Sequence, residues 1–329
     1  MEKFVKKQLI SDLKDGNHVD DIFVVKIKKS IMPYKNKSGS YFQLILSDNT
    51  GKTLEYNFWG SEDDTLLKEI YSKIKSDSVI RVQGRITVYN DKLQLTGNEE
   101  TLLQVLEPEQ YNQEDFIKAA KKNIEELYLK LKNILASIEN PQIKQLLSNI
   151  FNDSQIEKEF KKHPGAIEIH HNWIGGLLEH TLEVAHYCAL SYELFHSLNR
   201  DLLLAGALLH DIGKLKELNV TSRIKGSTEG QLTGHLVLGT VYVHNMIDKI
   251  EGFDESLKNK ILHLLISHHG KLEFGSPKEP MFAEALALYY ADEISSKIAW
   301  ISEFIQGAKE DTEDDFMYHP KFGKNIYLR

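Results

Sequence analysis

Six potential metal ligands recur at helix-sized intervals in the second half of this 329-residue chain. They are histidines and aspartates, namely His180, the adjacent pair His210 and Asp211, His235, His268 and Asp292. The intervals between them are 30, 24, 33 and 24 residues, and each accommodates one helix and a connection. The spacing therefore predicts that several helices direct these side chains at one point.

The residue types indicate a transition-metal site. Imidazole binds Mn, Fe, Co or Zn, and a carboxylate can bridge two divalent ions, so the mixture argues against a plain Mg or Ca site. Six donors are more than one tetrahedral zinc ion needs. A two-metal site typically activates water for attack on a phosphate ester. Because the chain has 14 histidines, the prediction depends on the segment LLLAGALLHDIGK, where an apolar run ends in His210 and Asp211.

Composition is that of a folded enzyme with room for two domains. Charged residues make up 27% of the chain, which excludes the disordered and fibrous classes. No apolar stretch is long enough to span a bilayer, and the start MEKFVKKQLISD lacks a signal-peptide core, so we expect a cytoplasmic protein without a membrane partner. The single cysteine, Cys188, fits a reducing compartment. A net charge of −8 argues against a lysine-coated DNA-binding protein and still allows a local basic groove.

Residues 18–107 have the pattern of a small β-barrel. Near-alternating β-branched and aromatic residues predict strands at 22–28, 41–47, 53–59, 79–88 and 93–96. Between the third and fourth strands, EDDTLLKEIYSKIKS has leucine and isoleucine at helical spacing. Five strands with a helix in this place is the order of an OB-fold, which commonly binds single-stranded nucleic acid.

Strand alternation also assigns side chains to the two faces of the barrel. Phe42 and Tyr56 point inward, and Asn57 points outward. The outer face carries aromatic and basic residues on which bases can stack and which can neutralise phosphates, namely Tyr41, Trp59, Arg81, Arg85 and Tyr89. Lys35 and Lys37 make the first hairpin basic. In the alternative that stays open, these aromatics are packing residues and the barrel docks a protein.

The rest of the chain predicts helices. Residues 115–162 carry apolar residues at helical spacing, and apolar helices follow at 177–195, 202–209, 235–250, 257–267 and 283–305. We therefore expect an α+β multidomain protein. Its parts are an N-terminal segment 1–17, a five-stranded OB-fold barrel 18–107, a helical connector 108–162, an all-α metal-binding domain 163–307 and a C-terminal tail 308–329.

Several segments resemble known enzymes. GGLLEHT, ALLHDIGKLKEL, EGQLTGHL and YYADEISSKI resemble the HD-domain phosphohydrolases. HHGK…GSPK and YFQLILSDNTG…FWG narrow the resemblance to the bacterial YhaM family of 3′-to-5′ exoribonucleases, which place an OB-fold before an HD domain. The resemblance covers nearly all of the chain. It implies metal-dependent hydrolysis that releases nucleoside monophosphates from the 3′ ends of single-stranded RNA, with single-stranded DNA as a further substrate.

The resemblance also implies a cofactor and a ligand set. The cofactor is a pair of divalent transition-metal ions, with Mn²⁺ favoured over Co²⁺, Fe²⁺ or Zn²⁺. One ion is held by His180, His210, Asp211 and Asp292, and the other by Asp211, His235 and His268. Asp211 is then the bridge, and His210 and Asp211 are the centre of catalysis.

Further residues receive supporting roles by the same resemblance. Lys214, one turn beyond His210, would present its ammonium to a phosphate or leaving group; alternatively, it is a helix C-terminal lysine favoured by the helix dipole. Because adjacent helical residues point about 100° apart, we expect His268 as the ligand and His269 as a supporting or substrate contact.

Three more residues complete this set. His170 and His171 match a histidine pair of the family, and they would contact RNA or support the ligands. Ser295 stands where the family often has a further aspartate.

Two other functions stay open at this stage. An HD phosphohydrolase could act on a small nucleotide, with the barrel as a docking module. A non-catalytic single-strand binder would have no physical need for six converging donors. The sequence leaves the oligomeric state open, a homo-oligomer included.

Overall fold

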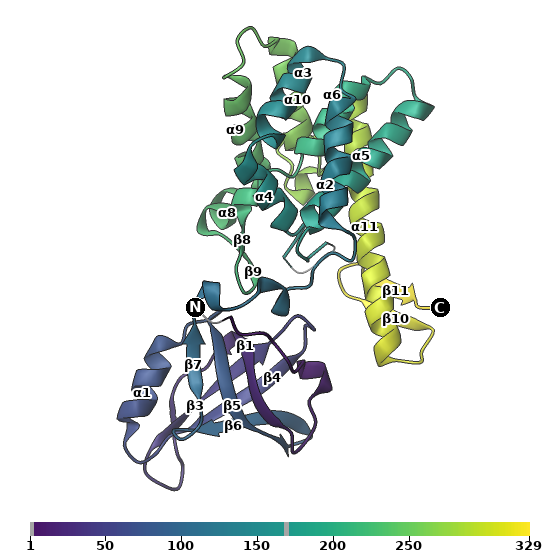
Figure 1. Ribbon diagram of the computed structural model, residues 1–329. Coiled ribbons are helices and arrows are strands. Elements are labelled where there is room, and N and C mark those ends of the chain that lie inside the picture. Colours follow the sequence, from purple (N-terminus) through teal and green to yellow (C-terminus); the bar gives the residue numbers. More distant parts are fainter. Residues whose placement is uncertain (1–2, 168–170) are drawn as a thin grey trace. The chain divides into compact units, whose positions relative to one another are not determined.

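A computed structural model describes residues 3–167 and 171–329, and the chain divides into two compact units (Figure 1). The first unit comprises Met1–Lys118 and Val220–Ile224, and the second comprises Ala119–Asn219 and Lys225–Arg329. None of the helices within these described ranges is both long and apolar enough to cross a membrane.

The first unit is a closed barrel of five strands, which confirms the expected OB-fold. The strands are β1 (His18–Lys28), β3 (Ser40–Ser47), β4 (Thr53–Trp59), β5 (Val79–Tyr89) and β6 (Lys92–Asn98). They pair in the order β1-β3-β4-β6-β5, and β5 pairs back to β1. Only the β4–β6 pairing is parallel. Two short strands extend the sheet, β2 (Met32–Pro33) beside β3 and β7 (Leu103–Leu106) beside β5.

The predicted alternation fills the barrel interior. Phe42, Tyr56 and Phe58 are fully buried, as expected for the inner face. The helix α1 (Asp64–Lys73) lies between β4 and β5, and its buried Leu67 joins the same core. Asp63 caps this helix by accepting a hydrogen bond from the backbone N–H of Thr65. Single 3₁₀ turns occupy Ile10–Asp12, Pro108–Gln110 and Gln113–Asp115.

The second unit is helical. Its first helices are α2 (Ile124–Ala136), α3 (Pro141–Phe151), α4 (Ser154–Lys162), α5 (Gly176–Leu194), α6 (Arg200–Leu209) and α7 (Lys214–Glu217). They are followed by α8 (Thr228–Thr233), α9 (His235–Ile247), α10 (Glu255–Ser267), a 3₁₀ turn at Leu272–Phe274 and α11 (Ala283–Asp311). One apolar core runs from Leu127 in α2 to Ala291 in α11, so the helices expected as a connector share a core with the helices that follow.

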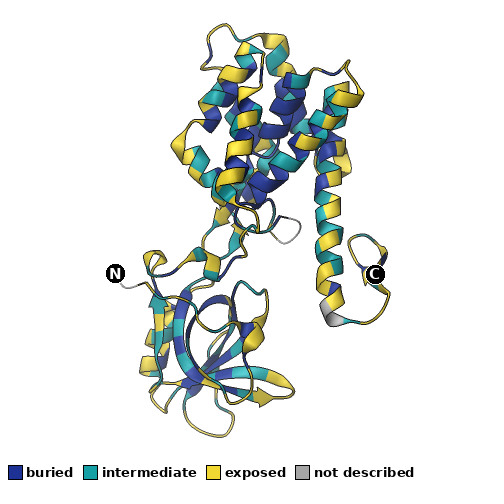
Figure 2. Cartoon of the chain, turned by 45° about the vertical axis from the view of Figure 1, so that its right-hand side comes forward, coloured by how far each residue is buried: buried dark blue, intermediate teal, exposed yellow. Residues whose placement is uncertain are grey.

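Helix α6 forms the centre of this core. Every residue from Asp201 to Leu209 is buried, and Figure 2 shows that buried residues, in dark blue, gather in the interior of the helical unit. A helix that is apolar on all sides is stable only inside a bundle. The buried helix therefore delivers His210 and Asp211, which follow directly, to the interior of the unit.

Two short hairpins differ from the expected loops and tail. One pairs β8 (Leu218–Val220) with β9 (Ile224–Gly226). The other pairs β10 (Phe316–His319) with β11 (Lys324–Tyr327), and it lies in the region 308–329 that we named the C-terminal tail. Helix α11 also continues beyond the expected end at residue 305 and ends at Asp311.

Candidate metal centre

Five helices place the predicted ligands at one point. His180 lies in the second turn of α5, and His210 and Asp211 follow the end of α6. His235 begins α9, His268 follows α10, and Asp292 lies in α11. Most of these positions are helix ends, where the chain leaves its apolar core and can present a polar side chain.

The ligand atoms form two clusters. His180, His210 and Asp292 form the first, and His235, His268 and His269 form the second. Within each cluster the candidate ligand atoms all lie within 4.8 Å of one another. The clusters combine residues far apart in the sequence, as the spacing predicted.

Asp211 lies between the two clusters. Its Oδ2 is 3.5 Å from His180 Nε2 and 3.3 Å from His210 Nε2. Its Oδ1 is 3.6 Å from His235 Nε2 and 3.8 Å from His268 Nε2. One carboxylate oxygen thus faces each cluster, which is the arrangement that a bridging ligand requires.

Backbone carbonyls orient three of the histidine rings. Each Nδ1 donates to a carbonyl oxygen at 2.7 to 3.0 Å, from His210 to Ala207, from His268 to Leu265 and from His269 to Phe274. Because a carbonyl can only accept, Nδ1 carries the proton. The lone pair of Nε2 is therefore directed at the centre, as in a metal-binding histidine.

Side chains orient the other two rings. His235 Nδ1 donates to Glu217 Oε1 at 3.0 Å. Burial would raise the pKa of Glu217, but the hydrogen bond from His235 outweighs it and lowers this pKa. Sequence reasoning missed Glu217, although it lies in the same HDIGKLKE segment as Asp211.

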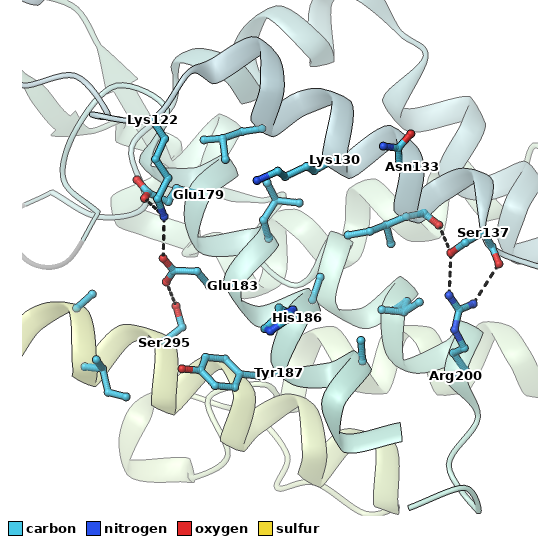
Figure 3. A pocket seen from close by; sticks show the side chains of 18 residues that line it. Lys122, Lys130, Asn133, Ser137, Glu179, Glu183, His186, Tyr187, Arg200 and Ser295 are labelled. Atoms are coloured by element: carbon cyan, nitrogen blue, oxygen red, sulfur yellow. Dashed lines mark hydrogen bonds and ion pairs between the residues drawn. The ribbon is translucent and has the colours of Figure 1, made fainter. Parts of the chain in front are cut away.

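His180 is held through a serine. Its Nδ1 lies 3.0 Å from Ser295 Oγ. This hydroxyl donates to Glu183 Oε2 at 2.8 Å, and Figure 3 shows this bond with Lys122 on the other side of Glu183. Glu183 also pairs with Lys122 at 3.8 Å and with His171 at 3.2 Å. Ser295, whose role the sequence left in doubt, therefore connects the predicted ligand His180 to the carboxylate of Glu183. Glu183 was missed, although it lies one turn from His180 on α5.

The protonation states suit a metal. Burial would raise the pKa of Asp211, but Lys214 and His210 hold this pKa well below its usual range. Burial lowers the pKa of His180 and His268, which favours neutral rings. His210 is the exception, because nearby Asp211 outweighs burial and raises its pKa. Ionised carboxylates and neutral imidazoles are the forms that bind cations.

Unsatisfied atoms indicate that a cation belongs here. Asp211 Oδ1 and His268 Nε2 are buried and have no hydrogen-bond partner among the described residues. A buried acceptor left in this state costs about 1 to 3 kcal/mol. Both atoms lie in the same cluster of potential metal-ligand atoms, so these residues fit divalent metal ions.

The structure places most of the supporting residues. Lys214 contacts Asp211 Oδ2 at 2.6 Å and the Gly165 carbonyl at 2.5 Å, so its ammonium holds a predicted ligand. His269 enters the second cluster beside His268. Our choice between these two histidines assumed a helix, but α10 ends at Ser267 and the 100° rule does not apply. His170 lies outside the described residues.

Some of the predicted nucleic-acid contacts on the barrel lie together in one aromatic cluster, and the others lie apart from it. Tyr41 and Trp59 are cross-strand partners, and both stack with Tyr34, which sequence reasoning missed. Lys37 lies 4.2 Å above the Tyr34 ring, and Lys35 is exposed nearby in sequence.

The other predicted contacts lie elsewhere on the barrel. Arg81 forms two hydrogen bonds with Asp20, at 2.8 and 2.9 Å, which compete with a phosphate. Arg85 is exposed, and Tyr89 is exposed at the far end of the β5–β6 pairing. Asn57, expected outside, is buried, and its side-chain amide is hydrogen-bonded by Gln43 and Gln94.

Comparison with known proteins identifies the class first. Residues 177–297 match the family described as HD domain. These residues include every member of both clusters, so the helical unit contains an HD domain with a candidate divalent metal centre.

Relatives then identify the family. The chain is 30% identical over 297 residues to the 3′-5′ exoribonuclease YhaM of Geobacillus sp. (strain WCH70), covering 89% of this chain and 87% of that one. It is 29% identical over 317 residues to the protein of the same name from Bacillus subtilis (strain 168), covering 94% and 97%. The chain belongs to the YhaM family, which confirms the resemblance seen in the sequence.

Solved structures also match parts of the chain. A replication factor A related protein from Methanobacterium thermoautotrophicum matches with a TM-score of 0.26 and 22% identity, over 31% of this chain and 93% of that chain.

Proposed function

We propose that this protein is a metal-dependent 3′-to-5′ exoribonuclease that acts on single-stranded RNA and releases nucleoside monophosphates. The observation that carries the proposal is the position of Asp211, whose two oxygens face two clusters of metal-binding side chains. Membership in the YhaM family, whose named relatives are 3′-5′ exoribonucleases, supports the same reaction.

The two clusters would hold two ions, with Asp211 shared. The first ion would be bound by His180, His210 and Asp292, and the second by His235, His268 and His269. We propose Mn²⁺ for both, because the donors mix imidazole nitrogen with carboxylate oxygen. When bound, such ions act as Lewis acids that lower the pKa of water and neutralise charge on a phosphodiester.

The protein's own residues keep this centre preorganised. Each histidine Nδ1 is hydrogen-bonded, so the rings need not turn when a substrate arrives. Lys214 holds Asp211 Oδ2 and favours its ionised form. Burial of His180, His210 and Asp211 excludes water from the inner side of the centre.

The barrel would bind the strand upstream of the cleaved end. Tyr34, Tyr41 and Trp59 offer stacked aromatic rings, and Lys37 adds a positive charge beside them. A strand bound in this way is presented to the HD domain at high effective concentration. Stacking tolerates either sugar, so we propose single-stranded DNA as a second substrate.

Polarity and strandedness test the proposal. A 5′-labelled single-stranded RNA incubated with Mn²⁺ is expected to shorten progressively from its 3′ end and to stop before a stable duplex. The same RNA with a blocked 3′ end is the matched control and is expected to resist hydrolysis. Internal fragments, or equal hydrolysis of the blocked RNA, would contradict the proposal and favour an HD phosphohydrolase for small nucleotides.

A further inference from the structure

A cavity extends from the metal centre along α11. Its volume is about 590 Å³, and it begins at Asp211 and Asp292. Its other end is lined by Trp300 and Phe322, the second of which lies in the turn between β10 and β11. The C-terminal hairpin therefore forms one wall of the cavity that contains the metal ligands.

The far end of the cavity is aromatic. The Trp300 and Phe322 rings are 4.7 Å apart at an angle of 43°, and both side chains are half-buried. Buried His319 packs against Trp300 at 5.1 Å and against Phe304 at 4.5 Å. These contacts attach the hairpin to α11 and hold both rings in place at the cavity wall.

The same wall is basic. Lys321 and Lys324 line the cavity from the hairpin turn, whose sequence HPKFGK contains no acidic residue. The ammonium of Lys321 lies 5.4 Å from the Trp300 ring. Among the described residues, Lys297 of the cavity pairs with Glu293, whereas neither hairpin lysine forms an ion pair with a carboxylate. In a chain of net charge −8, this places two uncompensated cations beside the aromatic rings.

We propose that this wall is a binding subsite for the RNA strand near its 3′ end. A base stacks on Trp300 and Phe322, and Lys321 and Lys324 neutralise the adjoining phosphates. The proposal rests on the proposed function. Trp300 follows Asp292 by eight residues of α11, or about 12 Å of helical rise. This distance corresponds to about three or four stacked nucleotides, so the base at Trp300 belongs to the last few of the strand.

Steady-state kinetics with oligoadenylate and Mn²⁺ test the subsite. Trp300→Ala and the double variant Lys321→Ala/Lys324→Ala are compared with the matched controls Tyr318→Ala and Lys309→Ala, which are exposed and do not line the cavity. KM is expected to rise about 5- to 150-fold in Trp300→Ala, the factor that a lost base stack represents. The controls are expected to keep the KM of the unmodified protein.

Strand binding without hydrolysis separates this proposal from the proposed function. The affinity for 5′-fluorescein-labelled oligoadenylate is measured by anisotropy in EDTA, and both cavity variants are expected to bind more weakly than their controls. If Trp300→Ala unfolds the hairpin, the lysine variant decides, because its side chains are exposed. Unchanged affinity in the lysine variant, or an equal loss in Lys309→Ala, would overturn the subsite. Failure of the unmodified protein to shorten RNA would instead overturn the proposed function.

Discussion

At the scale of single residues, the metal centre depends on what holds each histidine. All five rings use Nδ1 for a hydrogen bond and leave Nε2 for the centre. Three partners are backbone carbonyls, which a substitution cannot remove. The other two, Ser295 and Glu217, are side chains and can be tested.

Ser295→Ala removes the acceptor for His180 Nδ1 and separates this ring from Glu183. Loss of such a supporting partner typically lowers metal affinity about 10- to 100-fold. We expect this loss in a Mn²⁺ titration by calorimetry, with an unchanged circular dichroism spectrum. Ser191→Ala is the control, because Ser191 lies on α5 and, among the residues that the structure describes, its hydroxyl donates to the Tyr187 carbonyl alone. Equal Mn²⁺ affinity in the two variants would show that Ser295 does not position His180.

The side chains that converge on the two clusters could be predicted from the sequence, whereas their hydrogen-bond partners could not. Histidine and aspartate at helix-sized intervals specify a metal site by residue type alone. Glu183, Glu217 and Ser295 are ordinary polar residues whose role depends on which helix faces meet. The choice between His268 and His269 depends on where α10 ends, and the sequence does not show that it ends at Ser267.

At the scale of elements, close packing of α9 positions His235. A Cβ atom on Gly213 would lie 2.0 Å from the His235 carbonyl oxygen and 2.6 Å from the Gly239 nitrogen. The φ of Gly213 is −62°, so the need for glycine comes from this close approach of α9 and not from backbone conformation.

Gly213→Ala is therefore expected to destabilise the helical unit by about 1 to 3 kcal/mol and to displace His235. Thermal unfolding and Mn²⁺ titration measure the two effects. Gly307→Ala is the control, because a Cβ atom there meets no heavy atom within 4 Å and alanine favours a helix by up to about 1 kcal/mol. Equal thermal stability of the two variants would contradict this packing.

The aromatic residues of the barrel allow a second prediction for elements. Trp59 is 39% exposed and packs on Tyr41, whereas Tyr89 is 63% exposed and lies apart from that cluster. Trp59→Ala is expected to weaken binding of single-stranded RNA by about 1 to 3 kcal/mol, and Tyr89→Ala by less. Anisotropy at low salt measures both, with exposed Leu66→Ala as the control. Equal affinity in all three variants would mean that the aromatics serve another partner.

The barrel strands were predictable because alternation is a local signal, and the closed barrel follows the expected order. The C-terminal hairpin could not be predicted from the sequence. Its strands have four residues each, and the acidic run before it resembles a solvated tail. Packing of His319 on Trp300 and Phe304 stabilises the hairpin, and this packing depends on tertiary structure.

At the scale of the whole molecule, metal binding and stability are linked. The six predicted ligands come from five helices of one unit, so an ion that binds only the folded state stabilises all of them together. When the free ion concentration is 100 times the dissociation constant, each site adds about 2.7 kcal/mol to the free energy of unfolding.

Chelation by EDTA removes both ions and is therefore expected to lower the melting temperature of the helical unit by about 10 to 20 °C relative to saturating Mn²⁺. Differential scanning calorimetry measures the shift. The barrel contains none of the ligands and its transition is expected to stay in place, which provides an internal control. A shift of the barrel transition alone would contradict the assignment of the metal centre.

The count of metal ions in Asp211→Ala tests the central claim most directly. After loading with Mn²⁺ and desalting, mass spectrometry is expected to find about two ions per unmodified chain. Asp211→Ala is expected to retain fewer than about one and to leave single-stranded RNA intact, because Asp211 faces both clusters. Asp248→Ala, a change of an exposed aspartate on the same unit, is expected to keep both ions and activity. A full complement of metal together with full hydrolysis in Asp211→Ala would contradict a centre bridged by Asp211.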